Sequence, residues 1–194
     1  MCQNKPMEMF GTAAILAGGK STRMGFDKQR ILHERVTAAL RRVFPDILVV
    51  TARPELYRNV RTAADEYAGC GPLAGIHAAV KHSGSRYVYI TACDMPDFSP
   101  EYAAYLMARV RETGAPACVT LREGGKPHPF HGLYGKALLP ALERDLTAGL
   151  TSPGVLLADV GALFIPACEA PDIFCNLNTE AELAVWRASH ADIE

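Results

Sequence analysis

Short apolar segments recur along most of the chain and predict strands. Residues 12–17 form an apolar run that ends at a pair of glycines, which is typical of a buried strand followed by a tight turn. Residues 47–50 and 87–92 have the same character. Further strands are predicted at 60–63, 117–121 and 132–134.

Amphipathic segments lie between these strands and predict helices. Apolar residues recur at helical spacing from Val36 to Val43 and stop before Pro45, which predicts a helix over about 34–44. Further helices are predicted from 71 to about 82, from Pro100 onward, near 136–146 and near 179–189. Because strands alternate with helices, we expect one α/β domain of three layers, with a mostly parallel sheet covered by helices.

Length and composition favour a single globular domain. The chain has 194 residues, which suits one α/β domain better than two. We expect this domain to span 1–194, with 1–11 as an N-terminal extension. Hydrophobic residues make up 49% and charged residues 21%, a globular composition. The net charge of −1 argues against a nucleic-acid partner, because such binding depends on a surplus of Lys and Arg.

The cysteines and the apolar runs indicate the cellular compartment in which the protein works. Six cysteines are scattered without a C-x-x-C pair, which argues against a zinc ribbon and a disulfide scaffold. Reduced thiols of this kind are typical of the cytoplasm. The first residues lack the apolar run of a signal peptide, and no run approaches the ~18 residues of a membrane span. We therefore expect a cytoplasmic protein without membrane contact.

The segment after the first strand, LAGGKSTRMGFDK at 16–28, carries candidate chemistry. Paired glycines allow the backbone to approach a ligand and present N–H groups to anionic oxygens. Arg23 can hold a phosphate bidentately, and Lys28 adds a mobile charge. A Walker A loop would need glycine at the position of Ala14, and the G-x-G-x-x-G spacing is absent. The alternatives are a triphosphate-binding loop and a glycine turn with solvated charges.

Two carboxylates follow predicted strands. Asp65 comes after 60–63 and Asp94 after 87–92, at the strand ends where ligands bind in parallel sheets. One such carboxylate can hold Mg²⁺, which fills its other positions with water and phosphate oxygens. The alternatives are a turn aspartate at Asp94 and a solvated one at Asp65. We interpret His128 and His131, which lack a third metal ligand nearby in the sequence, as ordinary loop or strand positions.

Four motifs together resemble the signature of the molybdenum cofactor guanylyltransferases. They are the 16–28 segment, Asp65 with GPLAGI at 71–76, CDMP at 93–96 and NLNT at 176–179. They occur in the family order, and the match extends over 12–183. A match of four ordered motifs is far more specific than the glycine pair alone.

The resemblance implies a reaction and a set of site residues. It implies a Rossmann-like fold of the nucleotide-diphospho-sugar transferase type. The implied reaction transfers GMP from GTP to the terminal phosphate of molybdenum-molybdopterin and releases pyrophosphate. The implied cofactor is Mg²⁺. The resemblance also implies transient contacts with other cofactor-biosynthesis proteins and with molybdoenzymes. Carried over by position, the nucleotide-binding residues are Leu16, Ala17, Gly18, Gly19, Lys28, Asp65 and Asp94; the catalytic residues are Arg23, Lys28 and Asp94; the metal ligand is Asp94; and the acceptor-binding residues are Asn176 and Asn178.

The chain departs from the family pattern at two places. After Lys28 the helix is expected almost at once, without the usual apolar segment and glycine turn, and Thr51 stands where some relatives have Asn. Cytidylyltransferase relatives typically carry LAAG instead of LAGG, so Gly18 leaves more room for a purine. The alternatives are a nucleotidyltransferase that uses CTP or another phosphorylated acceptor, and a non-catalytic protein that binds and delivers the finished cofactor.

Overall fold

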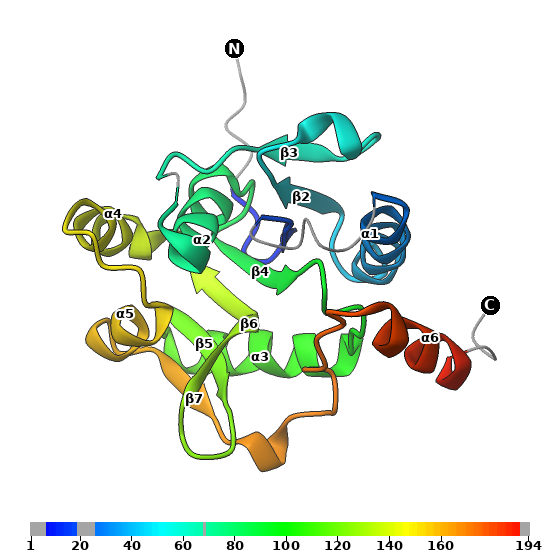
Figure 1. The fold of residues 1–194 in the computed structure, drawn as a ribbon. Helices are drawn as coiled ribbons and strands as arrows, with labels where there is room; N and C mark the ends of the chain where they lie inside the picture. Colours follow the sequence, from blue (N-terminus) through cyan, green and yellow to red (C-terminus); the bar gives the residue numbers. More distant parts are fainter. Residues whose placement is uncertain (1–6, 19–25, 68, 191–194) are drawn as a thin grey trace.

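A computed structural model describes residues 7–18, 26–67 and 69–190 of the chain. Within these residues the strands form one sheet in the order β3-β2-β1-β4-β6-β5-β7 (Figure 1). The strands are β1 (Thr12–Leu16), β2 (Asp46–Val50), β3 (Arg61–Ala63), β4 (Tyr87–Ala92), β5 (Ala117–Leu121), β6 (Pro127–Gly135) and β7 (Leu163–Ile165). Only β6 runs antiparallel to its neighbours, so the sheet of the described chain is mostly parallel, as predicted.

Helices cover both faces of this sheet, which makes three layers (Figure 1). One face carries α1 (Phe26–Leu40) and α3 (Pro100–Thr113), and the other carries α2 (Gly71–His82), α4 (Leu139–Thr147) and α5 (Pro153–Asp159). Alternate strand residues enter the two cores: Ala13 and Ile15 of β1 face α1, whereas Ala14 faces α2. Because both faces are buried, the central strands are nearly continuous apolar runs. A last helix, α6 (Glu180–Ser189), lies at one end of the sheet.

The structure differs from the prediction in its helix bounds and in its short elements. Helix α1 begins at Phe26 and ends at Leu40, not over 34–44. The early part of this helix was not predicted. Its residue Leu32 packs with the last helix in a separate buried cluster, so it does not extend the row of apolar residues that faces the sheet. Helix α5 and strand β7 were not predicted, since seven and three residues are too few to show a period. Strand β6 begins at Pro127, earlier than predicted. Its first residues were not predicted as strand because prolines argue against a strand.

The topology brings the carboxyl ends of all the parallel strands to one edge. The antiparallel β6 begins at this same edge, so the β5–β6 hairpin and the segment after β7 also lie there. Open α/β sheets bind their ligands at this edge. At the opposite edge the carbonyl of Met9 accepts a hydrogen bond from the Tyr87 amide at 2.9 Å, and Phe10 is buried. No described helix is both long enough and apolar enough to cross a membrane.

Candidate functional site

The end of β1 forms one side of the candidate site. The amide of Ala17 donates to the carbonyl of Val50 at 2.9 Å, and the amide of Cys93 donates to the carbonyl of Leu16 at 3.1 Å. The strand end is therefore held by both neighbouring strands. A Cβ atom at Gly18 would meet no atom of the described residues within 4 Å, so the described backbone here borders open space that a ligand can approach.

Only some of the residues expected beside this strand end belong to the described part of the chain. Gly19 and Arg23 lie outside the described residues. Lys28 lies in the first turn of α1, so the helix begins before Lys28 and not after it as expected; its side chain is outside the described part. Thr51 is buried, and its hydroxyl accepts a hydrogen bond from the Arg53 amide at 3.1 Å.

Helix α2 packs closely on the end of β1. A Cβ atom at Gly75 would lie 3.0 Å from Cδ1 of Leu16, so only glycine allows this approach without a shift. Asp65 is exposed in the loop before the helix, and its Oδ1 accepts a hydrogen bond from the Tyr67 amide at 2.9 Å. Asp65 follows β3, two strands away from β1, so its nucleotide contact stays a prediction.

Asp94 follows β4, the strand beside β1. Its side chain is half-buried, and this burial raises the pKa of the carboxyl group because it removes water from the charged form. Its carbonyl accepts a hydrogen bond from the Leu177 amide at 2.8 Å, which ties the loop to the segment before α6. Burial and, to a lesser extent, the charge of Asp94 raise the pKa of the Cys93 thiol to about 12. That thiol stays protonated, so it is not a nucleophile at neutral pH.

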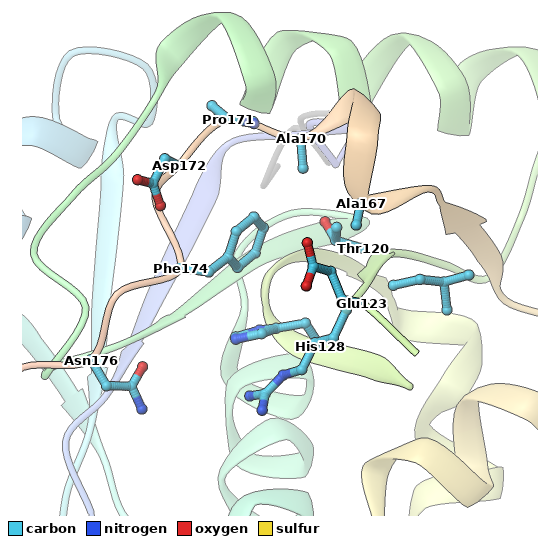
Figure 2. Close-up of a pocket in the computed structure, with 11 residues that line it drawn as sticks. Thr120, Glu123, His128, Ala167, Ala170, Pro171, Asp172, Phe174 and Asn176 are labelled. Carbon is cyan, nitrogen blue, oxygen red and sulfur yellow. The ribbon is translucent and has the colours of Figure 1, made fainter. Parts of the chain in front are cut away.

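A pocket of about 580 Å³ opens on the other side of β4 from β1 (Figure 2). Its walls are the end of β5, the hairpin that follows, the start of β6 and the segment 167–176. Figure 2 shows Phe174 and His128 near its centre and Asn176 at one end. Asn178 lies two residues before α6, and its amide donates to Oε2 of Glu182 in the first turn of that helix at 2.6 Å. The structure thus places one of the two acceptor candidates in the pocket.

His128 and His131 lie on β6 with buried rings. Nδ1 of His131 lies 2.9 Å from the Tyr89 hydroxyl, and its Nε2 lies 3.4 Å from the Thr91 hydroxyl. Burial lowers the pKa of His131 to about 3. Burial and, to a lesser extent, the charge of Arg122 lower the pKa of His128 to about 4. Both rings are therefore neutral at pH 7.

Apart from Asn176, the residues that build the pocket were not predicted as site residues. Glu123 lies in a polar turn between two predicted strands, and reading the second strand as antiparallel would have placed that turn at the ligand edge. His128 begins that same strand and was interpreted as an ordinary position. Phe174 lies in a segment without helix or strand, so no periodicity could indicate it.

Helix α6 contacts the loop 93–99 between β4 and α3, here called the Asp94 loop. The indole Nε1 of Trp186 donates to both carboxylate oxygens of Asp97, at 3.1 and 3.0 Å. The guanidinium carbon of Arg35 in α1 lies 4.4 Å from the Trp186 ring centroid. Leu32, Leu177, Leu183 and Trp186 form a buried cluster of their own. Helix α6 therefore joins α1, the Asp94 loop and the segment before α6.

We expect Trp186→Phe to lower the free energy of unfolding by about 1–3 kcal/mol, because the half-buried Asp97 carboxylate loses its indole donor. Urea unfolding measures this as a lower midpoint with an unchanged slope. The exposed neighbour Val185→Ala serves as the control and should shift stability by less than about 0.5 kcal/mol. If Trp186→Phe matched this control, the indole–carboxylate contact would not stabilise the fold.

A mostly parallel sheet with an open glycine position after β1 and a half-buried carboxylate after β4 is an α/β fold whose ligand edge suits a nucleotide. Residues 13–158 match the family described as the MobA-like NTP transferase domain. The chain belongs to this family.

Relatives agree with this assignment over most of the chain. A molybdenum cofactor guanylyltransferase of Syntrophotalea carbinolica is 40% identical over 92% of this chain and 91% of its own length. A probable molybdenum cofactor guanylyltransferase of Peptoclostridium acidaminophilum is 36% identical over 94% and 91%, respectively. The fold is shared with the crystal structure of molybdopterin-guanine dinucleotide biosynthesis protein A from Archaeoglobus fulgidus, with a TM-score of 0.76, 24% identity and coverage of 93% of this chain and 99% of that one.

Proposed function

We propose that the protein transfers GMP from GTP to the terminal phosphate of molybdopterin and releases pyrophosphate. The names of its relatives support this reaction. The observation that carries it is the position of Asp94, which follows β4, the strand between the open glycine position and the pocket. In this arrangement GTP lies over the end of β1, the acceptor enters from the pocket, and the reacting phosphates meet at Asp94.

The chemistry demands positioning and charge neutralisation more than proton transfer. The attacking group is already an anionic phosphate, so no general base is needed. The main obstacle is repulsion between two anions, which Arg23 and Lys28 would reduce from the nucleotide side. Gly18 lets the nucleotide approach the backbone, and Leu16 and Ala17 line its base and ribose. Asn176 and Asn178 would contact the acceptor.

The residues at Asp94 fit a magnesium ion. The described residues contain no cluster of three or more His, Cys, Asp or Glu side chains that could hold a metal alone. Mg²⁺ needs no such cluster, because it usually takes one or two carboxylates and completes its octahedron with water and phosphate oxygens. The half-buried carboxylate of Asp94, with its raised pKa, gains from a cation that offsets its desolvation. Bound there, Mg²⁺ would neutralise charge on the triphosphate.

Pyrophosphate release from GTP, molybdopterin and Mg²⁺ tests this function directly. We expect release only when all three are present. Binding of both substrates without pyrophosphate would instead indicate a protein that binds and delivers the cofactor. We place the reaction in the cytoplasm, a proposal supported by the free thiols of the described cysteines.

We expect turnover with GTP at least ten-fold faster than with CTP, a difference of ~1.4 kcal/mol in activation free energy. A Cβ atom at Gly18 would occupy open space beside the strand end, so glycine leaves more room for a purine. Pyrophosphate release with each nucleotide at equal concentration measures the ratio. Gly18→Ala should reduce it towards one. Equal rates in the wild-type protein would contradict the preference.

A further inference from the structure

The pocket has a fixed aromatic surface at its centre. The ring centroids of Phe174 and His128 lie 4.7 Å apart (Figure 2). Two further rings hold Phe174 edge-to-face, His131 at 5.4 Å and Tyr102 at 6.4 Å. Because three rings pack against Phe174, its orientation is fixed, and the part of the ring that lines the pocket can pack against a ligand without rearrangement.

His128 adds a neutral surface to this wall. Its Nδ1 lies 3.3 Å from both the amide nitrogen and the carbonyl oxygen of Phe130, so the backbone engages this nitrogen in either tautomer. Its Nε2 is left for a ligand. With the pKa at about 4, the ring carries no charge at pH 7. A flat, uncharged partner suits such a surface better than an ion does.

The charged groups that line the pocket indicate which polar groups the edge of that partner carries. They are Arg122, Glu123 and Asp172, one cation against two anions. This balance disfavours a phosphate group, whereas carboxylates accept hydrogen bonds from ring N–H groups. Glu123 and Phe174 both line the pocket, so a ring packed on Phe174 can turn its edge towards the Glu123 carboxylate (Figure 2). The volume of about 580 Å³ is within the range of small-molecule sites.

The pocket is also linked to the reaction centre. Asn176 lines it, and the next residue, Leu177, donates its amide hydrogen to the carbonyl of Asp94. A ring held in the pocket can therefore extend a phosphate-bearing arm towards Asp94.

We propose that this pocket binds the pterin ring of the acceptor, with Phe174 and His128 packed against the ring and Glu123 accepting hydrogen bonds from its aminopyrimidinone edge. The proposal rests on the proposed function, which supplies a pterin as the acceptor. Guanine has the same donor edge, so the experiment must separate the pterin from the nucleotide. The order of the strands favours the pterin, because the open glycine position lies across Asp94 from the pocket.

Binding of 6-hydroxymethylpterin to the full chain, followed by its fluorescence, tests the site. We expect Phe174→Ala to weaken binding at least ten-fold and Phe174→Tyr to change it less than three-fold, since tyrosine retains the ring. Glu123→Gln should weaken binding at least five-fold. The matched control is Glu112→Gln, an exposed carboxylate in the last turn of α3, next to the opposite edge of the sheet, and it should leave binding unchanged. Thermal melting confirms that each variant is folded, and the exposed Glu123 keeps the test valid if Phe174→Ala unfolds.

Three results of the binding experiment would overturn the proposal. They are absence of pterin binding, equal affinity in the wild type and in both Phe174→Ala and Glu123→Gln, and displacement of the pterin by GTP. The last would assign the pocket to the nucleotide base. Pterin binding that depends on Phe174, without pyrophosphate release from GTP and molybdopterin, would remove the proposed function and leave the pocket assignment intact. Conversely, normal transfer by Phe174→Ala with an unchanged KM for molybdopterin would remove the pocket assignment alone.

Discussion

Asp94→Asn is expected to lower turnover at least a hundred-fold, a loss of ~2.7 kcal/mol of transition-state stabilisation. Asparagine keeps the size of the side chain and one oxygen but lacks the charge that holds a divalent cation. Folding should be spared. Burial raises the pKa of the Asp94 carboxyl group, so the ionised form is less favourable in the folded protein than in the unfolded chain. We therefore expect the variant to be as stable as the wild type or slightly more stable at pH 7.

Pyrophosphate release across a Mg²⁺ titration, together with thermal melting, measures both parts of this prediction. The matched control is Asp159→Asn at the end of α5, close to the start of β7 and thus next to the opposite edge of the sheet. Its turnover should remain within two-fold of the wild type. The metal assignment is wrong if Asp94→Asn turns over normally at low Mg²⁺, or if it is inactive only because it is unfolded.

The fold was predictable where a segment is buried on both faces or has enough length to show a period. Strands β1, β2 and β4 occur as predicted because their apolar runs have no polar face. The helix from Pro100 occurs as predicted because proline favours the first turn of a helix, and in the structure the Ser99 side chain accepts a hydrogen bond from the Tyr102 amide. The first half of α1 was missed because Leu32 packs against Trp186, a contact that no local pattern can show.

The candidate site also has a part that was predictable from the sequence and a part that was not. Glycine after β1 and Asp94 after β4 were predictable, because a strand followed by a glycine or a carboxylate is a local pattern. The pocket was not, because it joins a hairpin at Glu123 to an irregular segment at Phe174 that is distant in the sequence. Only the strand order, with the antiparallel β6 between β4 and β5, brings these two segments together.

Acidification is expected to destabilise the protein through His128 and His131. Both rings are buried and neutral, with pKa values of about 4 and about 3, whereas an unfolded histidine has a pKa of ~6.5. Between these values the unfolded chain binds more protons than the folded protein, so the free energy of unfolding falls as the pH falls. The loss begins near pH 6.5 and continues to about pH 4 for His128 and about pH 3 for His131. From pH 6.5 to pH 5 the two groups together cost about 3 kcal/mol.

Urea unfolding at a series of pH values isolates this effect, because the slope against pH counts protons whatever the absolute stability of a variant. His131 has a left-handed backbone, with φ of 53°, and asparagine tolerates this conformation better than most other residues that carry a side chain, so His131→Asn is the suitable substitution. Between pH 4.5 and pH 6 it should reduce the slope by up to about 1.4 kcal/mol per pH unit. His128→Gln should reduce it by a similar amount, and the two reductions should add, since each removes one titrating ring. Identical slopes in the wild type and both variants would show that the two rings are not held neutral by burial.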